Sequence, residues 1–140
     1  MSLYSGGTGK TFTISCLLSY FLANGDIVLA TALSAVASKL MEAGSTLNRK
    51  LKVPVNITKD SICLFNKNTA VGKLMQLAIL LVIDEVSMGH KHIYEAVDRS
   101  LREVQGVDAP FGGLCVVFTG DWRQTVPVIF DGSESQIVDA

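Results

Sequence analysis

Apolar and polar positions divide this chain into short apolar runs separated by longer mixed segments. The runs have the length and continuity of strands buried on both faces of a sheet, and they lie at residues 27–30, 77–83 and 114–119. The segments between them have helical length, and the helices we expect cover residues 11–23, 34–43, 69–76 and 90–104. Strands that alternate with helices predict an α/β domain with a mostly parallel sheet and right-handed crossovers.

Two details refine this pattern. The expected helix at 34–43 should be closed by Gly44, and the helix at 90–104 carries its apolar residues on one stripe. Between residues 45 and 68 the pattern weakens, because Pro54 and several Asn and Lys residues interrupt it. We expect a loop-rich excursion there, with one turn of helix near Asp60.

Composition bounds the class of protein. A chain of 140 residues with 49% hydrophobic and 18% charged residues is expected to form one globular domain. The formal net charge of −1 excludes a global basic field, so any contact with DNA must come from a local patch. The longest apolar run, 77–83, is too short to cross a bilayer, and no secretory signal is evident, so we expect an intracellular protein without membrane contact.

The cysteines and histidines carry little predicted chemistry. Cys16, Cys63 and Cys115 form no C-x-x-C pair, and we expect them to be small buried hydrophobes in a reducing compartment. His90 and His92 are two residues apart on an expected helix, so they should face different directions and share no metal.

A glycine-rich segment near the start of the chain indicates a phosphate-binding loop. It consists of Gly6, Gly7, Thr8, Gly9, Lys10 and Thr11. Glycines allow the backbone N–H groups to approach phosphate oxygens, Lys10 would reach the β- and γ-phosphates, and the Thr11 hydroxyl would hold Mg²⁺. The helix that follows directs its positive N-terminal end at the same anion. The loop predicts a nucleoside triphosphate with Mg²⁺, but an ordinary glycine-rich turn is the alternative.

Polar residues follow the second and third apolar runs. Asp84 and Glu85 end the run at 77–83, where a P-loop ATPase holds Mg²⁺ with an acid and activates water with a base. A solvated turn is the alternative. Gln124 follows the third run and could contact both the attacking water and the γ-phosphate, although a plain loop residue would be the default interpretation.

These segments together resemble the PIF-type (petite integration frequency) ATP-dependent DNA helicases, including the helicase part of Helitron transposons. The matching segments are residues 6–12, 28–32, 83–88, 96–102 and 111–129. The stretch 124–129 is the most family-specific part, because many other P-loop ATPases share the first motifs. The resemblance covers nearly the whole chain in the correct order.

The resemblance implies a three-layer, RecA-like P-loop domain and a role for each matching residue. Those residues are Gly7 and Gly9 for backbone contacts to phosphate, Lys10 and Thr11 for phosphate and Mg²⁺, Asp84 for Mg²⁺, Glu85 as catalytic base, Gln124 as γ-phosphate sensor and Thr31 for a phosphate of single-stranded DNA. Without the resemblance, Thr31 would be interpreted as a strand-end cap. The implied activity is ATP-driven movement along one DNA strand from 5′ to 3′, with single-stranded DNA or duplex junctions as partner.

The chain also departs from the family pattern. Tyr4 stands where the family has the first P-loop Gly, Ser5 where Pro is usual, and Ala35 where a DNA-contact motif has Gly. The resemblance covers only part of a first RecA-like domain, in residues 1–140, and the second domain with its transition-state arginines is not in this sequence. Such an arginine is worth about 10³–10⁵ in rate, so we expect this chain alone to hydrolyse ATP slowly.

Two other functions remain open on the sequence. One is a truncated remnant that binds nucleotide without turnover, and the other is a small P-loop kinase. If the source is eukaryotic, the resemblance implies the nucleus, and the family's roles imply DNA repair, recombination and telomere maintenance.

Overall fold

The computed structural model describes residues 9–121 of the chain, and its centre is a parallel β-sheet. The strands are β1 (Val28–Ala32), β2 (Ser45–Thr46), β3 (Leu80–Asp84) and β4 (Cys115–Phe118). They lie in the order β2-β1-β3-β4, and each neighbouring pair runs parallel. The α/β class and the parallel sheet predicted from the sequence are therefore confirmed.

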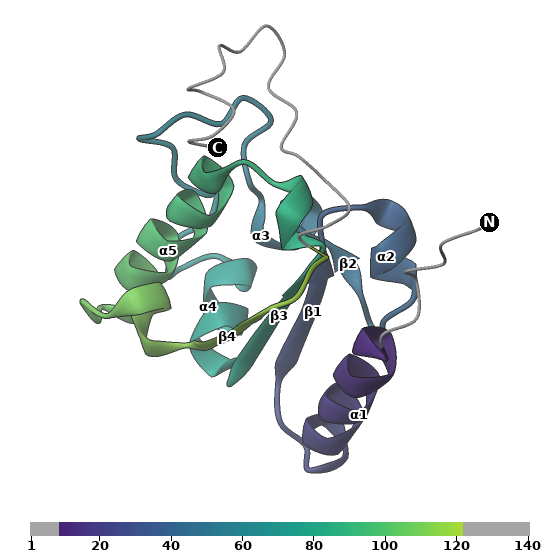
Figure 1. Cartoon of the computed structure of the whole chain (residues 1–140). Helices are drawn as coiled ribbons and strands as arrows, with labels where there is room; N and C mark the ends of the chain where they lie inside the picture. The colour runs from purple at the N-terminus through teal and green to yellow at the C-terminus, as the bar shows by residue number, and fades with distance from the viewer. Residues whose placement is uncertain (1–8, 122–140) are drawn as a thin grey trace, which may run out of the picture.

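Helices cover both faces of the sheet and complete three layers. They are α1 (Lys10–Ala23), α2 (Ala35–Lys39), α3 (Leu47–Leu51), α4 (Ala70–Leu77) and α5 (Lys91–Gln105), with short 3₁₀ turns η1 (Val86–Met88) and η2 (Pro110–Gly113). Figure 1 shows α1 and α2 on one side of the sheet and α4 and α5 on the other. The carboxyl ends of β1 and β3 point toward the end of the sheet where α1 begins.

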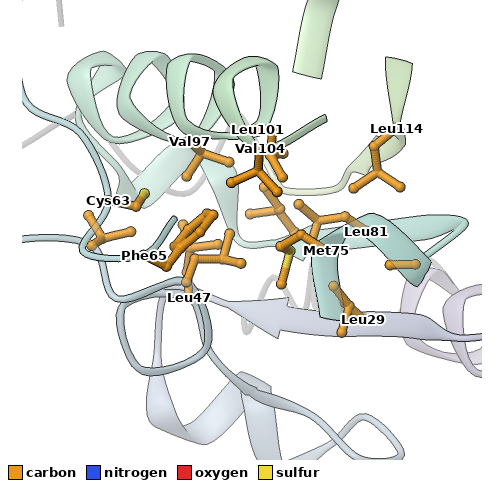
Figure 2. Close-up of a cluster of buried hydrophobic side chains, with 14 of the residues drawn as sticks. Leu29, Leu47, Cys63, Phe65, Met75, Leu81, Val97, Leu101, Val104 and Leu114 are labelled. Atoms are coloured by element: carbon orange, nitrogen blue, oxygen red, sulfur yellow. The ribbon is translucent and has the colours of Figure 1, made fainter. Parts of the chain in front are cut away.

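Side chains of the two central strands alternate between two apolar cores. Leu29, Leu81 and Ile83 point into a core shared with α3, α4 and α5, and Figure 2 shows part of this cluster around Phe65 and Met75. The intervening residues point into a second core beneath α1 and α2, and they are Ala30, Ala32, Leu80 and Val82. This period of two explains why both strands are apolar without interruption.

The structure shortens one predicted helix. α2 ends at Lys39 with Leu40 as its cap, whereas the sequence predicted a helix to residue 43. The chain instead folds back so closely that a Cβ on Gly44 would lie 2.0 Å from the backbone oxygen of Ser38. This return brings Ser45 into register with Thr31 and so creates β2, which the sequence did not predict.

The predicted helical turn near Asp60 is wrong. A hydrogen-bonded turn stands there, in which Ser61 N–H donates to the Thr58 oxygen at 3.1 Å. The helical turn of this region is α3 instead, because Leu47 and Leu51 are four residues apart and both are fully buried. The remaining helices α1, α4 and α5 confirm the predicted segments to within one residue at each end.

The second and third apolar runs differ from their predictions in extent and burial. The second run was expected from residue 77, but Leu77 ends α4 and the strand begins at Leu80. The third run was expected to be fully buried, yet Cys115 and Phe118 in β4 are exposed. Within residues 9–121, β4 is hydrogen-bonded to β3 alone, so its other edge is uncovered there.

Two of the three cysteines also differ from their predicted burial. Cys63 is buried as predicted, but Cys16 and Cys115 are exposed, and all three are free thiols. Within the described part, no helix has the length and apolar character to span a membrane.

Candidate functional site

The N-terminus of α1 has the backbone features of an anion-binding helix start. Gly9 precedes the helix with φ 73°, a left-handed conformation that glycine adopts at little cost. Gly9 has no side chain to cap the helix, and within residues 9–121 no cap hydrogen bond occupies its first N–H groups, which can therefore bind a ligand. Lys10 and Thr11 are exposed in the first turn.

Two carboxylates stand at the carboxyl end of β3. Asp84 Oδ1 accepts a hydrogen bond from Glu85 N–H at 2.8 Å and a second one from the Thr119 hydroxyl. Glu85 has φ 58° and ψ 37°, a left-handed conformation that is unfavourable for a residue with a Cβ. Its Oε2 atom is buried and has no hydrogen-bond partner in the described part of the chain. Strained, unpaired groups of this kind are characteristic of functional sites.

A cleft of about 190 Å³ joins these two groups. It is lined by Lys10, Thr11, Val36, Ala37, Leu40, Asp84, Glu85, Ser87, Met88, Gly120 and Asp121. The cation and hydroxyl of α1 therefore lie in one cleft with the two carboxylates that follow β3. The apolar wall of the cleft consists of Val36 and Ala37 from α2 together with Leu40 and Met88.

The end of β4 is fastened to the segment that carries the carboxylates. Thr119 N–H donates to the Ile83 oxygen at 2.9 Å, and Val86 N–H donates to the Thr119 oxygen at 3.0 Å. A Cβ on Gly120 would lie 3.1 Å from Val86 Cγ2, so glycine permits this close approach. Ser87 adds a hydrogen bond from its hydroxyl to the Asp121 oxygen at 3.2 Å.

Tyr94 supports the same segment from α5. Its hydroxyl donates to the Val86 oxygen at 2.5 Å, and its ring meets Phe118 edge-on with centroids 5.7 Å apart. Burial raises the pKa of Tyr94 well above its ordinary value, so the hydroxyl keeps its proton and stays a donor. A Cβ on Gly89 would collide with this hydroxyl, which explains the glycine there.

Thr119 and Tyr94 were not identified from the sequence. The signal for Thr119 was the strand register, since Ile83 pairs with Phe118 and the next residues along are therefore Asp84 and Thr119. Tyr94 gave no sequence signal, because its contact depends on how α5 packs.

Thr31 lies inside the sheet. It is fully buried, and its hydroxyl donates to the Val82 oxygen at 2.8 Å. The hydroxyl is thus committed to the β1–β3 contact in this structure, and the DNA contact implied for Thr31 stays a prediction.

The two histidines are closer than predicted. Their ring centroids lie 4.4 Å apart, because His90 is the N-cap of α5 and not part of its helical turn. Within residues 9–121, no group of three or more His, Cys, Asp or Glu side chains could hold a metal. Of the remaining site residues, Gly6, Gly7, Thr8 and Gln124 lie outside the described residues.

The cleft fits a magnesium ion carried by a nucleotide. Mg²⁺ is commonly bound through one or two carboxylates together with substrate phosphates and water. Asp84 Oδ1 is occupied by two hydrogen bonds, whereas Oδ2 makes none within residues 9–121. Thr11, which carries a hydroxyl group, lines the same cleft. One carboxylate oxygen and one hydroxyl form a suitable pair of protein groups for this ion.

Comparisons with known proteins identify relatives of this chain. Residues 3–140 match the family model described as PIF1-like helicase. The ATP-dependent DNA helicase Pif1 of Psychrobacter sp. (strain PRwf-1) is 32% identical over 127 residues, which are 89% of this chain and 19% of that protein. The ATP-dependent DNA helicase PIF1 of Trypanosoma brucei brucei is 33% identical over 124 residues, which are 86% of this chain and 12% of that protein.

Solved structures show the same likeness. Bacteroides Pif1 helicase in complex with ADP-AlF3 and single-stranded DNA matches with a TM-score of 0.78 at 30% identity, over 95% of this chain and 30% of that one. Bacteroides Pif1 bound to single-stranded DNA matches with a TM-score of 0.75 at 31% identity over the same shares. The chain thus spans 30% of these two structures and less than a fifth of the two curated relatives.

Proposed function

The chain belongs to the PIF1-like helicase family, and we propose that it forms part of the first RecA-like domain of an ATP-dependent DNA helicase. The observation that carries this proposal is the single cleft that contains Lys10 and Thr11 together with Asp84 and Glu85. A cation and a hydroxyl at a helix N-terminus, facing two carboxylates at a strand end, match the needs of a magnesium nucleotide.

Each residue of the cleft has a distinct task in this proposal. Lys10 binds the β- and γ-phosphates, and the N–H groups at the start of α1 bind phosphate oxygens. Thr11 and Asp84 hold Mg²⁺, which neutralises charge on the phosphate oxygens when bound. Gly6, Gly7, Thr8 and Gly9 complete the loop around the phosphates.

Glu85 is the proposed base. Its unpartnered Oε2 can accept the proton of a water molecule, because no described group already occupies that oxygen. Gln124 is proposed to sense the γ-phosphate. This role rests on the family resemblance of the segment 124–129, because Gln124 lies outside the described residues.

The proposed ligand and partner follow from the solved relatives. Bacteroides Pif1 has been crystallised with ADP-AlF3 and single-stranded DNA, and two Pif1 helicases have been described at forked duplex DNA. By analogy, we propose ATP as the nucleotide and single-stranded DNA or a duplex junction as the partner, with movement from 5′ to 3′ in the whole protein. Thr31 remains a proposed DNA contact on the strength of its motif alone.

The proposal predicts that Lys10→Ala weakens the binding of Mg·ATP to the chain. Loss of the lysine removes a charge-assisted contact to the phosphates, so the dissociation constant should rise by about 10-fold or more. Equilibrium titration with a fluorescent ATP analogue in excess Mg²⁺ measures this directly.

Lys73→Ala is the matched control. Lys73 is exposed on α4 and does not line the cleft, and its substitution removes the same charge from a helix. The control should bind like the wild-type chain. Equal affinity of wild type and Lys10→Ala would refute the site, whereas tight binding without any hydrolysis would support the binding-only alternative.

A further inference from the structure

The hydroxyl of Thr119 and the carboxylate of Asp84 form a contact that the roles assigned so far do not include. Thr119 follows β4, and Asp84 ends β3, so the contact joins two strands at the mouth of the cleft. Both residues are half-buried, and each lies at the carboxyl end of its own strand.

Three hydrogen bonds fix Thr119 relative to the segment that carries the two carboxylates. Its N–H donates to Ile83, its backbone oxygen accepts from Val86, and its side chain donates to Asp84. The two backbone bonds set the position of Thr119 whatever its side chain is. Its hydroxyl is therefore held at a constant place beside Asp84.

The hydroxyl determines which oxygen of Asp84 is left for a ligand. Asp84 Oδ1 accepts hydrogen bonds from the Thr119 hydroxyl and from Glu85 N–H. Together these two bonds restrict rotation of the carboxylate group about χ2. Without the hydroxyl, the carboxylate keeps only the bond to its neighbour's N–H and is free to rotate. Carboxylates that bind metals depend on such outer partners for their orientation.

We infer that Thr119 is a positioning residue that orients Asp84 for Mg²⁺ and thereby sets how strongly Mg²⁺ increases nucleotide affinity. This inference rests on the proposed function, because it takes Asp84 as the magnesium carboxylate. Thr119 touches neither nucleotide nor metal, and it acts only through Asp84.

The test compares Thr119→Val with Thr119→Ser. Valine keeps the shape and the β-branch of threonine and leaves both backbone hydrogen bonds intact, but it removes the hydroxyl. Serine keeps the hydroxyl. Each variant of the 140-residue chain is titrated with a fluorescent ATP analogue once in EDTA and once in excess Mg²⁺. The ratio of the two affinities is the magnesium enhancement. Urea unfolding of each variant reports any loss of stability separately.

We expect Thr119→Val to lower the magnesium enhancement by about 10- to 100-fold, the usual effect of losing an outer partner of a metal ligand. Its affinity in EDTA should match that of the wild type, and Thr119→Ser should retain the enhancement. An unchanged enhancement in Thr119→Val would overturn the inference. So would an equal loss of affinity with and without Mg²⁺, because that result assigns Thr119 to the fold alone.

The same titrations separate this inference from the proposed function. If the wild-type chain shows no magnesium enhancement, the magnesium site itself fails, and the role of Thr119 fails with it. If the wild type shows the enhancement and Thr119→Val shows it equally, only the positioning role fails.

Discussion

At the residue scale, Glu85 combines two unfavourable features in one position. Its backbone is left-handed, which costs a residue with a Cβ roughly 1–2 kcal/mol. Its carboxylate also buries one oxygen without a hydrogen bond among the described residues, and such a loss costs about 1–3 kcal/mol. Both costs are consistent with a group kept ready for a ligand, and they predict that Glu85 lowers the stability of the fold.

Replacement of Glu85 by glycine should therefore raise the free energy of unfolding. Lys52→Gly is the matched control, because Lys52 is also left-handed, with φ 51°, but is exposed and outside the cleft. Both variants relieve the strain of a left-handed backbone. In both, glycine also raises the conformational entropy of the unfolded chain, which offsets about 0.4–1 kcal/mol of the gain in stability. Only Glu85→Gly also removes the unpaired carboxylate, so it should exceed the control by about 1–3 kcal/mol.

Urea unfolding followed by circular dichroism measures this difference. A Glu85→Gly variant no more stable than Lys52→Gly would show that the buried oxygen is satisfied in solution. The account of Glu85 as a destabilising functional residue would then be wrong.

At the element scale, α5 begins with an unusual cap. His90 Nδ1 accepts the N–H of His92 at 3.2 Å, a role that only the unprotonated nitrogen can fill. Burial lowers the pKa of His90 below its ordinary value of 6.5, and the nearby His92 and Lys91 lower it further, whereas Glu95 acts in the opposite sense. The folded state therefore binds this proton more weakly than the unfolded state.

This cap makes the stability of the chain depend on pH. Because the pKa of His90 is lower in the folded state, its contribution is complete above pH 6.5 and is lost as the pH falls toward the folded pKa. His90→Asn retains a good N-cap without the titrating ring. The wild type should lose more stability than His90→Asn between pH 7.5 and 5.5, as measured by urea midpoints. Parallel losses in the two proteins would contradict the role of the cap, since His92 is common to both.

Elements with strong local signals were predictable from the sequence. α5 was predicted because its apolar stripe repeats with the helical period. β3 was predicted because its apolar run is uninterrupted, as expected of a strand that is buried on both faces. β2 was missed because two residues carry no periodicity, and its pairing depends on the return of the chain at Gly44. The exposure of β4 was also missed, because an apolar run indicates a strand but not its place in the sheet.

In the candidate site, too, some residues carry a local sequence signal, whereas other features depend on the tertiary structure. Lys10, Asp84 and Glu85 were identified because motif spacing and strand ends are visible in the sequence. The left-handed backbone of Glu85 was not predicted, because no sequence motif marks a left-handed residue at the N-cap of η1. Thr119 was missed because its hydroxyl has meaning only once β3 and β4 are in register.

At the scale of the whole molecule, the parallel topology is what brings the site together. β3 and β4 end at the same edge of the sheet, and α1 begins there, so residues far apart in sequence line one cleft. Among the described residues that line this cleft, Lys10 is the one basic side chain. A transition-state arginine is worth about 10³–10⁵ in rate, so nucleotide binding is a more direct readout of the cleft than hydrolysis.

The most direct test of the central claim is a map of where Mg·ATP binds on the chain. Backbone amide shifts are followed by NMR during titration with Mg·ATP. We predict saturable shifts at Lys10, Thr11, Glu85 and Gly120 around the cleft. Gln105, which lines a separate hollow near the start of β4, should stay unchanged. Shifts centred on that second hollow, or no saturable shifts at the four cleft residues, would contradict the account.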